Sequence, residues 1–323
     1  MADDVAIDFE KMSLWTEGEV TEFFESGGTE EPKPKAALPP MAPPMKPVPM
    51  EEFKKWFPKT FFQGEPVYKQ PPKFRMVCFH PAGCAESVWS GNGMRQKDPN
   101  PFVAHCKDKG GELLACELPG REQRRAEERS QSYGPYVEQL FPVLAPVLQD
   151  GVPYVICCHS MATWFTYEFV KKLVVCGIPL PSQLVISGFP APDIPFKERP
   201  WNQCRHMADP AFMDEARGWD TNEIVFQPNT WKVYSGLMRD DFMLFDEYEY
   251  TPLPDCVKEG LPIPMQCYFA KDDKRVKKAH LEGWKNFTTA TCDVYEAPGK
   301  HLFFFDVPNR KQYMMDVLSR LPF

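Results

Sequence analysis

Long apolar runs are missing from this sequence of 323 residues. A membrane-spanning helix needs roughly 18 or more consecutive apolar residues, and no such stretch occurs, so we expect no membrane span. The first ten residues are acidic and lack the basic segment followed by an apolar one that marks a secretory signal. Transit peptides are rich in arginine and poor in acids, so an organellar transit peptide is disfavoured too.

Paired cysteine spacings are also missing. No C-x-x-C motif occurs among the 11 cysteines, and the scattered cysteines and histidines show no metal-ligand spacing. The number of cysteines is odd, and Cys157 and Cys158 stand inside an apolar string. Both observations indicate reduced thiols and hence a cytoplasmic protein, with organellar targeting left open. Glycine-rich loops of the P-loop or dinucleotide-binding type are absent as well. We therefore expect neither a metal ion nor a bound cofactor.

A broad excess of positive charge is the third absence. The net charge is −8, and residues 1–31 contain ten acids but only one base, so residues 32–323 are close to neutral. A near-neutral surface does not provide the affinity for phosphate backbones that nucleic-acid binding requires. The sequence therefore predicts no nucleic-acid partner.

Composition divides the chain into a leader, residues 1–49, and a domain, residues 50–323. The first 31 residues are acidic, and residues 32–49 contain eight prolines, which favour an extended polyproline-like spacer. We predict that the leader is largely disordered. The alternative is that aromatic residues near its start, such as Trp15 and Phe23, bind the domain or a partner.

The domain alternates short apolar strings with helical patterns, which predicts an α/β fold with a mostly parallel central sheet flanked by helices. Helices are expected over Ser132–Leu148, Ala162–Cys176, Ala279–Phe287 and Arg310–Arg320. Residues 191–254 interrupt the alternation and predict an inserted helical cap. The expected strands are Arg75–His80, Glu112–Glu117, Tyr154–His159, Gln183–Gly188, Met265–Ala270 and Cys292–Ala297.

Ser160 stands between an expected strand and an expected helix, as a nucleophile elbow requires. The backbones approach closely at such a turn, so the residues two before and two after the serine must be small. Glycine is usual at both positions, and here they are Cys158 and Ala162. The alternative is a polar residue at an ordinary junction of strand and helix.

Three further loops follow expected strands and carry matching chemistry. The loop after His80 places Ala82 where an α/β hydrolase provides one oxyanion-hole amide, with Met161 providing the second. Asp273 and His301 follow later strands, and the order Ser160, Asp273, His301 is that of α/β-hydrolase triads. From the residues alone, Asp272 is an equal candidate for the acid, His301 could be structural, and His80-Pro81 could be a simple turn.

From about residue 73 to 320 the chain resembles the type II thioesterases, the stand-alone editing enzymes of polyketide, nonribosomal peptide and fatty-acid synthesis. The resemblance implies an α/β-hydrolase fold and a Ser160–His301–Asp273 triad, because the family's acid lies eleven residues before a helix tryptophan, here Trp284. The motifs that carry it are Phe79-His-Pro-Ala-Gly83, Leu118-Pro-Gly-Arg-Glu-Gln-Arg-Arg125, His159-Ser-Met-Ala162, Arg239-Asp-Asp-Phe242, Lys271-Asp-Asp273 and Pro298-Gly-Lys-His301.

The resemblance further implies hydrolysis of acyl thioesters on an acyl carrier protein or coenzyme A, each of which presents a phosphopantetheine arm. The alternatives are an oxygen-ester hydrolase or acyltransferase with the same triad, and a catalytically silent hydrolase fold that binds partners through its leader. Asp241 matches a recurring family position that we interpret as structural. Lys274, Arg275, Lys277 and Lys278 are expected near the site, where they could receive an acidic carrier. The expected acyl-channel residues are Phe212, Trp231, Leu237, Met238 and Phe242.

Overall fold

The computed structural model describes residues 37–58, 71–91 and 100–323. The acidic half of the leader lies outside these residues, so its disorder and the docking of its aromatic residues stay predictions.

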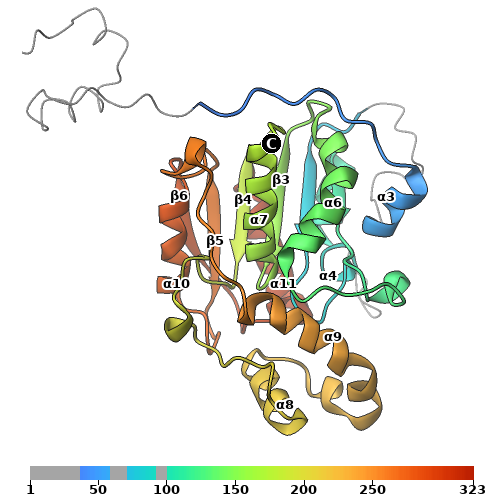
Figure 1. Ribbon diagram of the computed structural model, residues 1–323, viewed down its shortest axis with the longest axis vertical. Coiled ribbons are helices and arrows are strands. Elements are labelled where there is room, and N and C mark those ends of the chain that lie inside the picture. The colour runs from blue at the N-terminus through green and yellow to red at the C-terminus, as the bar shows by residue number, and fades with distance from the viewer. Residues whose placement is uncertain (1–36, 59–70, 92–99) are drawn as a thin grey trace, which may run out of the picture. The chain divides into compact units, whose positions relative to one another are not determined.

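The centre of the domain is a sheet of six strands in the order β2-β1-β3-β4-β5-β6, in which every neighbouring pair is parallel. β1 and β3, which pair with each other, are mostly apolar and are buried along their whole length, as expected for strands covered on both faces. The predicted α/β-hydrolase architecture is confirmed (Figure 1). The strands are β1 (Arg75–Phe79), β2 (Glu112–Ala115), β3 (Tyr154–His159), β4 (Gln183–Ser187), β5 (Met265–Ala270) and β6 (Cys292–Ala297).

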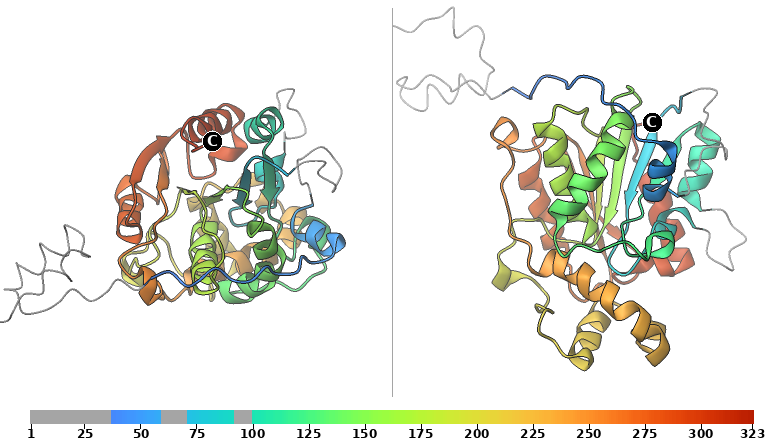
Figure 2. Two further views of the ribbon diagram at one scale, coloured as in Figure 1. Left: turned by 90° about the horizontal axis from the view of Figure 1, so that it is seen from above. Right: turned by 45° about the vertical axis from the view of Figure 1, so that its right-hand side comes forward.

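Helices cover both faces of the sheet (Figure 2). One face packs against α6 (Tyr133–Leu148) and α7 (Ala162–Val175), with α10 (Lys278–Glu282) beside β5 and β6. The other face packs against α5 (Pro101–Lys109) and α11 (Val307–Leu318). Each face thus has its own apolar core, and the strands hold both in register. The short helix α4 (Ser87–Ser90) follows the loop after β1.

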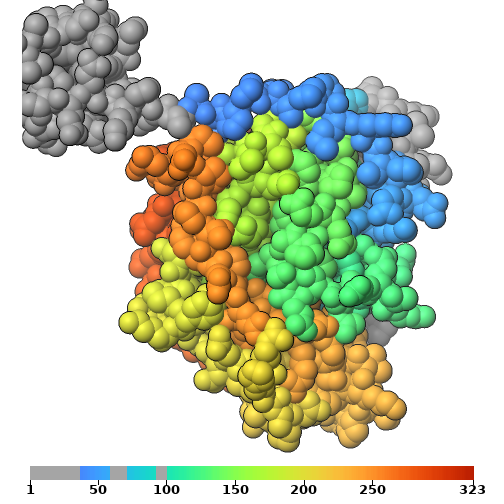
Figure 3. Space-filling view, in the orientation of Figure 1, coloured from blue at the N-terminus to red at the C-terminus, as the bar shows by residue number. Residues whose placement is uncertain are grey.

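The expected cap region, residues 191–254, contains α8 (Asp209–Gly218) and α9 (Pro228–Asp246) between β4 and β5. Figures 1 and 3 show these helices, in yellow and orange, beyond the ends at which the strands finish. Because the strands are parallel, the loops that follow them open toward this cap. The cap therefore covers the loops that carry the expected catalytic residues.

The described end of the leader packs on the domain. The Ala42 amide donates to the Gly177 carbonyl (2.9 Å), and the Met45 amide donates to Oε1 of Gln149 (2.8 Å). Helix α3 (Met50–Trp56) follows and buries Trp56, whose carbonyl accepts from the Glu117 amide (2.7 Å). In Figure 3 this blue segment crosses the end of the domain opposite the cap.

All 11 cysteines are free. Among the helices of the described residues, none combines the length and the apolar character needed to cross a membrane.

Candidate active site

Ser160 occupies the sharp turn between β3 and α7. Its φ angle is +57°, a left-handed conformation that a non-glycine residue adopts only when its surroundings enforce it. Its amide donates to the Ser187 carbonyl at the end of β4 (2.9 Å), which fixes the turn to the sheet. Cys158 and Ala162 are buried there, so side chains as small as these fit where glycine is usual. The elbow forms in spite of both replacements.

The structure brings Ser160, His301 and Asp273 together in one chain of hydrogen bonds. Oγ of Ser160 lies 2.9 Å from Nε2 of His301, and Nδ1 of His301 lies 2.7 Å from Oδ2 of Asp273. All three side chains are buried. The neighbouring Asp272 is exposed, so the geometry selects Asp273 as the carboxylate that faces the imidazole.

Asp273 is held as a carboxylate. Burial by itself would raise its pKa, but the facing His301 and the hydrogen bond from its ring outweigh burial, so the pKa of Asp273 lies below its ordinary value. Its Oδ1 accepts from the amides of Arg275 (2.8 Å) and Val276 (3.0 Å), which leaves Oδ2 for the histidine. A carboxylate in this position accepts a hydrogen bond from Nδ1–H of His301, which leaves Nε2 unprotonated toward the serine.

Two cap residues hold His301 from the other side. The Trp219 ring packs edge-on against the imidazole, with the ring centroids 4.7 Å apart. Oδ2 of Asp220 accepts the backbone amide of His301 (3.1 Å). Sequence reasoning missed the role of both residues, because the turn that carries them lies 81 positions from the histidine it contacts.

The two expected oxyanion donors come from different loops: Ala82 follows β1 and lines the same cavity as Ser160, and Met161 follows Ser160 directly. Among the described residues, neither amide has a protein acceptor. The Met161 carbonyl accepts from the Tyr133 hydroxyl (2.9 Å), which fixes that peptide from helix α6. Two such uncommitted N–H groups can stabilise a negative oxygen near Ser160.

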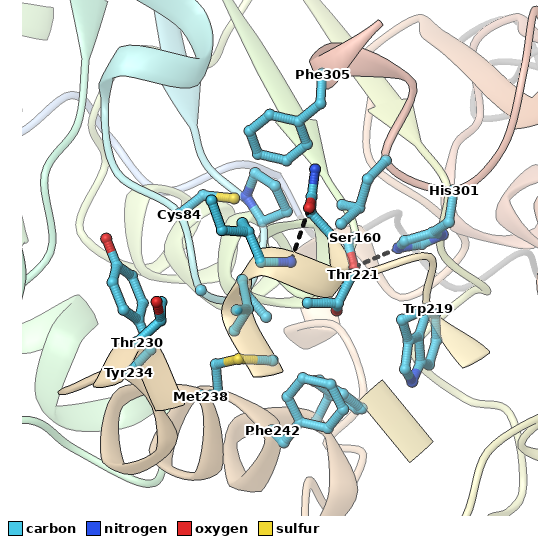
Figure 4. A pocket seen from close by; sticks show the side chains of 18 residues that line it. Cys84, Ser160, Trp219, Thr221, Thr230, Tyr234, Met238, Phe242, His301 and Phe305 are labelled. Atoms are coloured by element: carbon cyan, nitrogen blue, oxygen red, sulfur yellow. Dashed lines mark hydrogen bonds between the residues drawn. The ribbon is translucent and has the colours of Figure 1, made fainter. Parts of the chain in front are cut away.

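A cavity of about 470 Å³ opens beside Ser160 and His301 and is lined mostly by apolar side chains. Figure 4 shows Met238 and Phe242 of α9 on one side of it and Phe305 on another. Its volume suits a small ligand with an apolar chain. Its lining residues also include Ala82, Gly83, Cys84, Trp219, Thr221, Ile224, Val225, Thr230, Tyr234, Phe245 and Leu302.

The five expected channel residues divide into those at the cavity and those behind it. Met238 and Phe242 line the cavity. Phe212 and Trp231 do not: Phe212 packs against Phe242 and Trp231 as a second layer. Leu237 lines a neighbouring hollow instead. Apolar character alone does not distinguish the wall of a cavity from the core that supports it.

The basic residues after Asp273 are engaged within the chain. Arg275 pairs with Glu215 (2.6 Å) and lies over the Trp219 ring, so it fastens the cap. Lys277 donates to the Asp273 carbonyl, and the ammonium groups of Lys274 and Lys278 lie 3.7 Å from carboxylates. Arg275 and Lys277 are thus committed within the chain, whereas the side chains of Lys274 and Lys278 are 62% and 60% exposed, so the docking of an acidic carrier on this cluster stays a prediction.

Comparisons with known proteins agree with this geometry. The family model described as "Thioesterase domain" matches residues 74–312. The probable anguibactin biosynthesis thioesterase AngT of Vibrio anguillarum is 30% identical over 203 residues, which cover 63% of this chain and 78% of that protein. The human medium-chain S-acyl fatty acid synthase thioesterase is 24% identical over 255 residues, covering 76% and 86%.

Solved structures share the fold. RedJ, a thioesterase of the prodiginine pathway of Streptomyces coelicolor, superposes with a TM-score of 0.65 at 22% identity, covering 80% of this chain and 92% of that one. The type II thioesterase BorB of the borrelidin cluster gives a TM-score of 0.62 at 23% identity, covering 82% and 97%. The chain belongs to the thioesterase family, as its resemblance to the type II enzymes predicts.

Proposed function

We propose that the chain hydrolyses acyl thioesters carried on the phosphopantetheine arm of an acyl carrier protein or of coenzyme A, with Ser160, His301 and Asp273 as its catalytic triad. The observation that carries the proposal is the hydrogen-bonded chain Ser160–His301–Asp273 at the edge of a largely apolar cavity. The apolar wall suits the acyl chain, and Ser160 lines the same cavity, where its Oγ can reach the thioester carbonyl carbon.

The geometry supports the following mechanism. His301 takes the proton of Ser160 as Oγ attacks the thioester carbonyl carbon, and the amides of Ala82 and Met161 stabilise the resulting oxyanion. The carbon–sulfur bond then breaks, and the thiolate leaves with the proton from His301. Water attacks the acyl-enzyme and gives a proton to His301; the bond from the acyl carbon to Oγ then breaks, His301 returns the proton to Oγ of Ser160, and the acid leaves.

The proposal extends to the compartment of the enzyme and to the carrier of its acyl group. Eleven free cysteines support a reducing compartment, so we place the enzyme in the cytoplasm. AngT is named for anguibactin biosynthesis and BorB for the borrelidin biosynthetic cluster, which we take as support for a carrier protein as the acyl donor.

A panel of acyl-carrier, acyl-coenzyme A and oxygen-ester substrates of matched chain length tests the proposal, with wild type and Ser160→Ala compared on each. We expect the thioesters to turn over faster than the esters and the variant to lose several orders of magnitude in kcat. Undiminished turnover by Ser160→Ala would remove the triad, and faster turnover of esters would change the substrate class.

A further inference from the structure

The oxyanion loop, residues 81–84, is held by side chains from two distant segments. The Gly83 amide donates to Oδ2 of Asp241 (2.8 Å), and the Cys84 carbonyl accepts from Nη1 of Arg121 (3.1 Å). Gly83 has a φ angle of +68°, so the loop makes a tight left-handed turn at this point. One peptide on either side of Gly83 is thereby fixed, and the Ala82 amide lies next to them in the chain.

Arg121 and Asp241 also bind each other. Nη2 of Arg121 lies 2.9 Å from Oδ1 of Asp241, and Nη1 lies 3.1 Å from Oδ2. The side chains are 2% and 1% exposed, so the pair is fully buried. Arg121 follows β2 and Asp241 belongs to α9, so a single ion pair joins three parts of the chain: the segment after β2, the cap helix and the oxyanion loop.

The same cap helix forms one wall of the acyl cavity. Met238 lies one turn before Asp241 and Phe242 directly after it, and both line the cavity. Met238 also lies close to the loop: it lines the same cavity as Gly83, and a Cβ added at Gly83 would be 3.5 Å from its Cγ. A displacement of α9 by a ligand would therefore move the carboxylate that accepts the Gly83 amide.

Stability alone is a poor explanation for this pair. Removing two charges from water costs free energy that their attraction only partly returns, so a buried ion pair is often no better than apolar residues of the same volume. Its geometry, in contrast, is specific: the guanidinium fork places two nitrogens on the carboxylate while one of them also binds the loop carbonyl.

We infer that Arg121 and Asp241 are positioning residues. They fix the oxyanion loop, and with it the Ala82 amide, relative to cap helix α9. The inference rests on the proposed function only in that it takes Ala82 as an oxyanion donor. The pair makes the oxyanion hole depend on the placement of the helix that contacts the acyl chain, although neither of the two residues touches the reacting atoms.

Asp241→Asn and Arg121→Lys test this inference. The first keeps an oxygen for the Gly83 amide but leaves Arg121 without its carboxylate. The second keeps the charge pair, so it reports even where Asp241→Asn does not fold, but an ammonium cannot hold Asp241 and the Cys84 carbonyl in the same fork. Asp240→Asn is the matched control. Asp240 lies on α9 beside Asp241, but its carboxylate binds Arg129 (2.7 Å) and makes no contact with the loop.

Two readouts separate positioning from a merely structural role. The first is kcat for a 4-nitrophenyl acyl ester, per active site. The second is the dissociation constant of an alkyl trifluoromethyl ketone, followed by ¹⁹F NMR, whose adduct with Ser160 places an oxyanion in the hole. We expect kcat to fall and the dissociation constant to rise together, by about 10- to 100-fold in Asp241→Asn and about tenfold in Arg121→Lys, with the control unchanged.

Loss of kcat with an unchanged dissociation constant, equal losses in Asp240→Asn, or wild-type values in both folded variants would each overturn the inference. Neither readout uses a thioester. Failure of wild type to hydrolyse thioesters would thus refute the proposed function while leaving the ketone measurement to decide the role of the pair.

Discussion

The ring of His159 supports the backbone of His301. Nε2 of His159 lies 3.0 Å from the His301 carbonyl oxygen, and its Nδ1 lies 2.9 Å from Oγ of Ser187. Burial, helped by the nearby His301, holds the pKa of His159 well below its ordinary value, so the ring is neutral. A carbonyl can only accept, so the single ring proton is on Nε2. The residue before the nucleophile therefore fixes the residue that activates it.

Replacing His159 by leucine removes this support, and we expect kcat to fall about 10- to 100-fold because a small displacement of His301 misaligns it with Ser160. KM should change little, since His159 does not line the cavity. His159→Gln keeps an N–H near the position of Nε2 and is the matched control. Steady-state kinetics on the folded variants provide the measurement, and equal losses in both would contradict a role through the hydrogen bond.

Asp273 and Asp272 are neighbours with opposite surroundings. Asp273→Asn should lower kcat about 10⁴-fold, because an amide does not hold His301 in its productive tautomer. Asp272→Asn should leave kcat close to wild type, because the side chain is exposed. Turnover of one acyl thioester by the two variants compares them directly, and the reverse ranking would move the acid by one residue.

Protonation of His80 should appear in the pH dependence of stability. Its ring is 1% exposed, and burial, with the nearby Arg121 adding to it, lowers the pKa of His80 to about 3. The unfolded chain binds a proton there near pH 6.5, so the free energy of unfolding loses about 1.4 kcal/mol per pH unit from this group as pH falls from about 6 toward 3. This contribution is absent above pH 7.

His80→Asn tests the sign and the size of that slope. Asparagine retains an N–H near Nδ1 for the Pro81 carbonyl, which the histidine reaches at 3.0 Å, but it does not titrate. Urea unfolding at pH 6, 5 and 4 should show the variant losing about 1.4 kcal/mol less than wild type per pH unit. Other titrating groups cancel in the difference, so parallel curves would mean that His80 is charged in the folded protein.

The leader and helix α3, which follows it, should differ in what their loss does. Deleting residues 1–49 removes the hydrogen bonds of Ala42 and Met45 but no part of the active site, so turnover of a small acyl thioester should be nearly unchanged.

Trp56→Ala should lower the free energy of unfolding by about 3–5 kcal/mol, because the ring is 1% exposed and carries the Arg124 guanidinium 4.0 Å from its centre. Urea unfolding and turnover of both variants provide the test, and a collapse of turnover in the deletion would place the leader in the active domain's core.

The sequence predicts those features of the fold that depend on local pattern. Apolar strings bounded by turns placed all six strands to within two residues, and the strand-to-loop position of Ser160 marked the elbow. The contact between Gly83 and Asp241 joins positions 158 apart, and no local pattern encodes it. Helical periodicity in α9 could have identified the wall of the cavity, because four residues that line it recur at spacings of three or four: Tyr234, Met238, Phe242 and Phe245.

The acyl cavity allows a test of what the cap does. Met238 and Phe242 are 4% and 3% exposed and form its wall, whereas Phe212 packs behind Phe242 and touches no part of the cavity. Met238→Trp should shorten the preferred acyl chain and Phe242→Ala should lengthen it, since each methylene excluded or admitted changes binding by about 0.8 kcal/mol, or roughly fourfold. Turnover of acetyl substrates should change much less than that of long-chain substrates.

Phe212→Leu is the control for this test, because it alters the layer behind the wall without changing the wall. We expect it to lower stability while leaving the ranking of chain lengths as in wild type. The measurement is kcat/KM across an even-numbered series of acyl thioesters, taken for all three variants at one protein concentration. A single common factor across the series in Met238→Trp and Phe242→Ala would mean that α9 is scaffold, because only a side chain in contact with the acyl group can distinguish one length from the next.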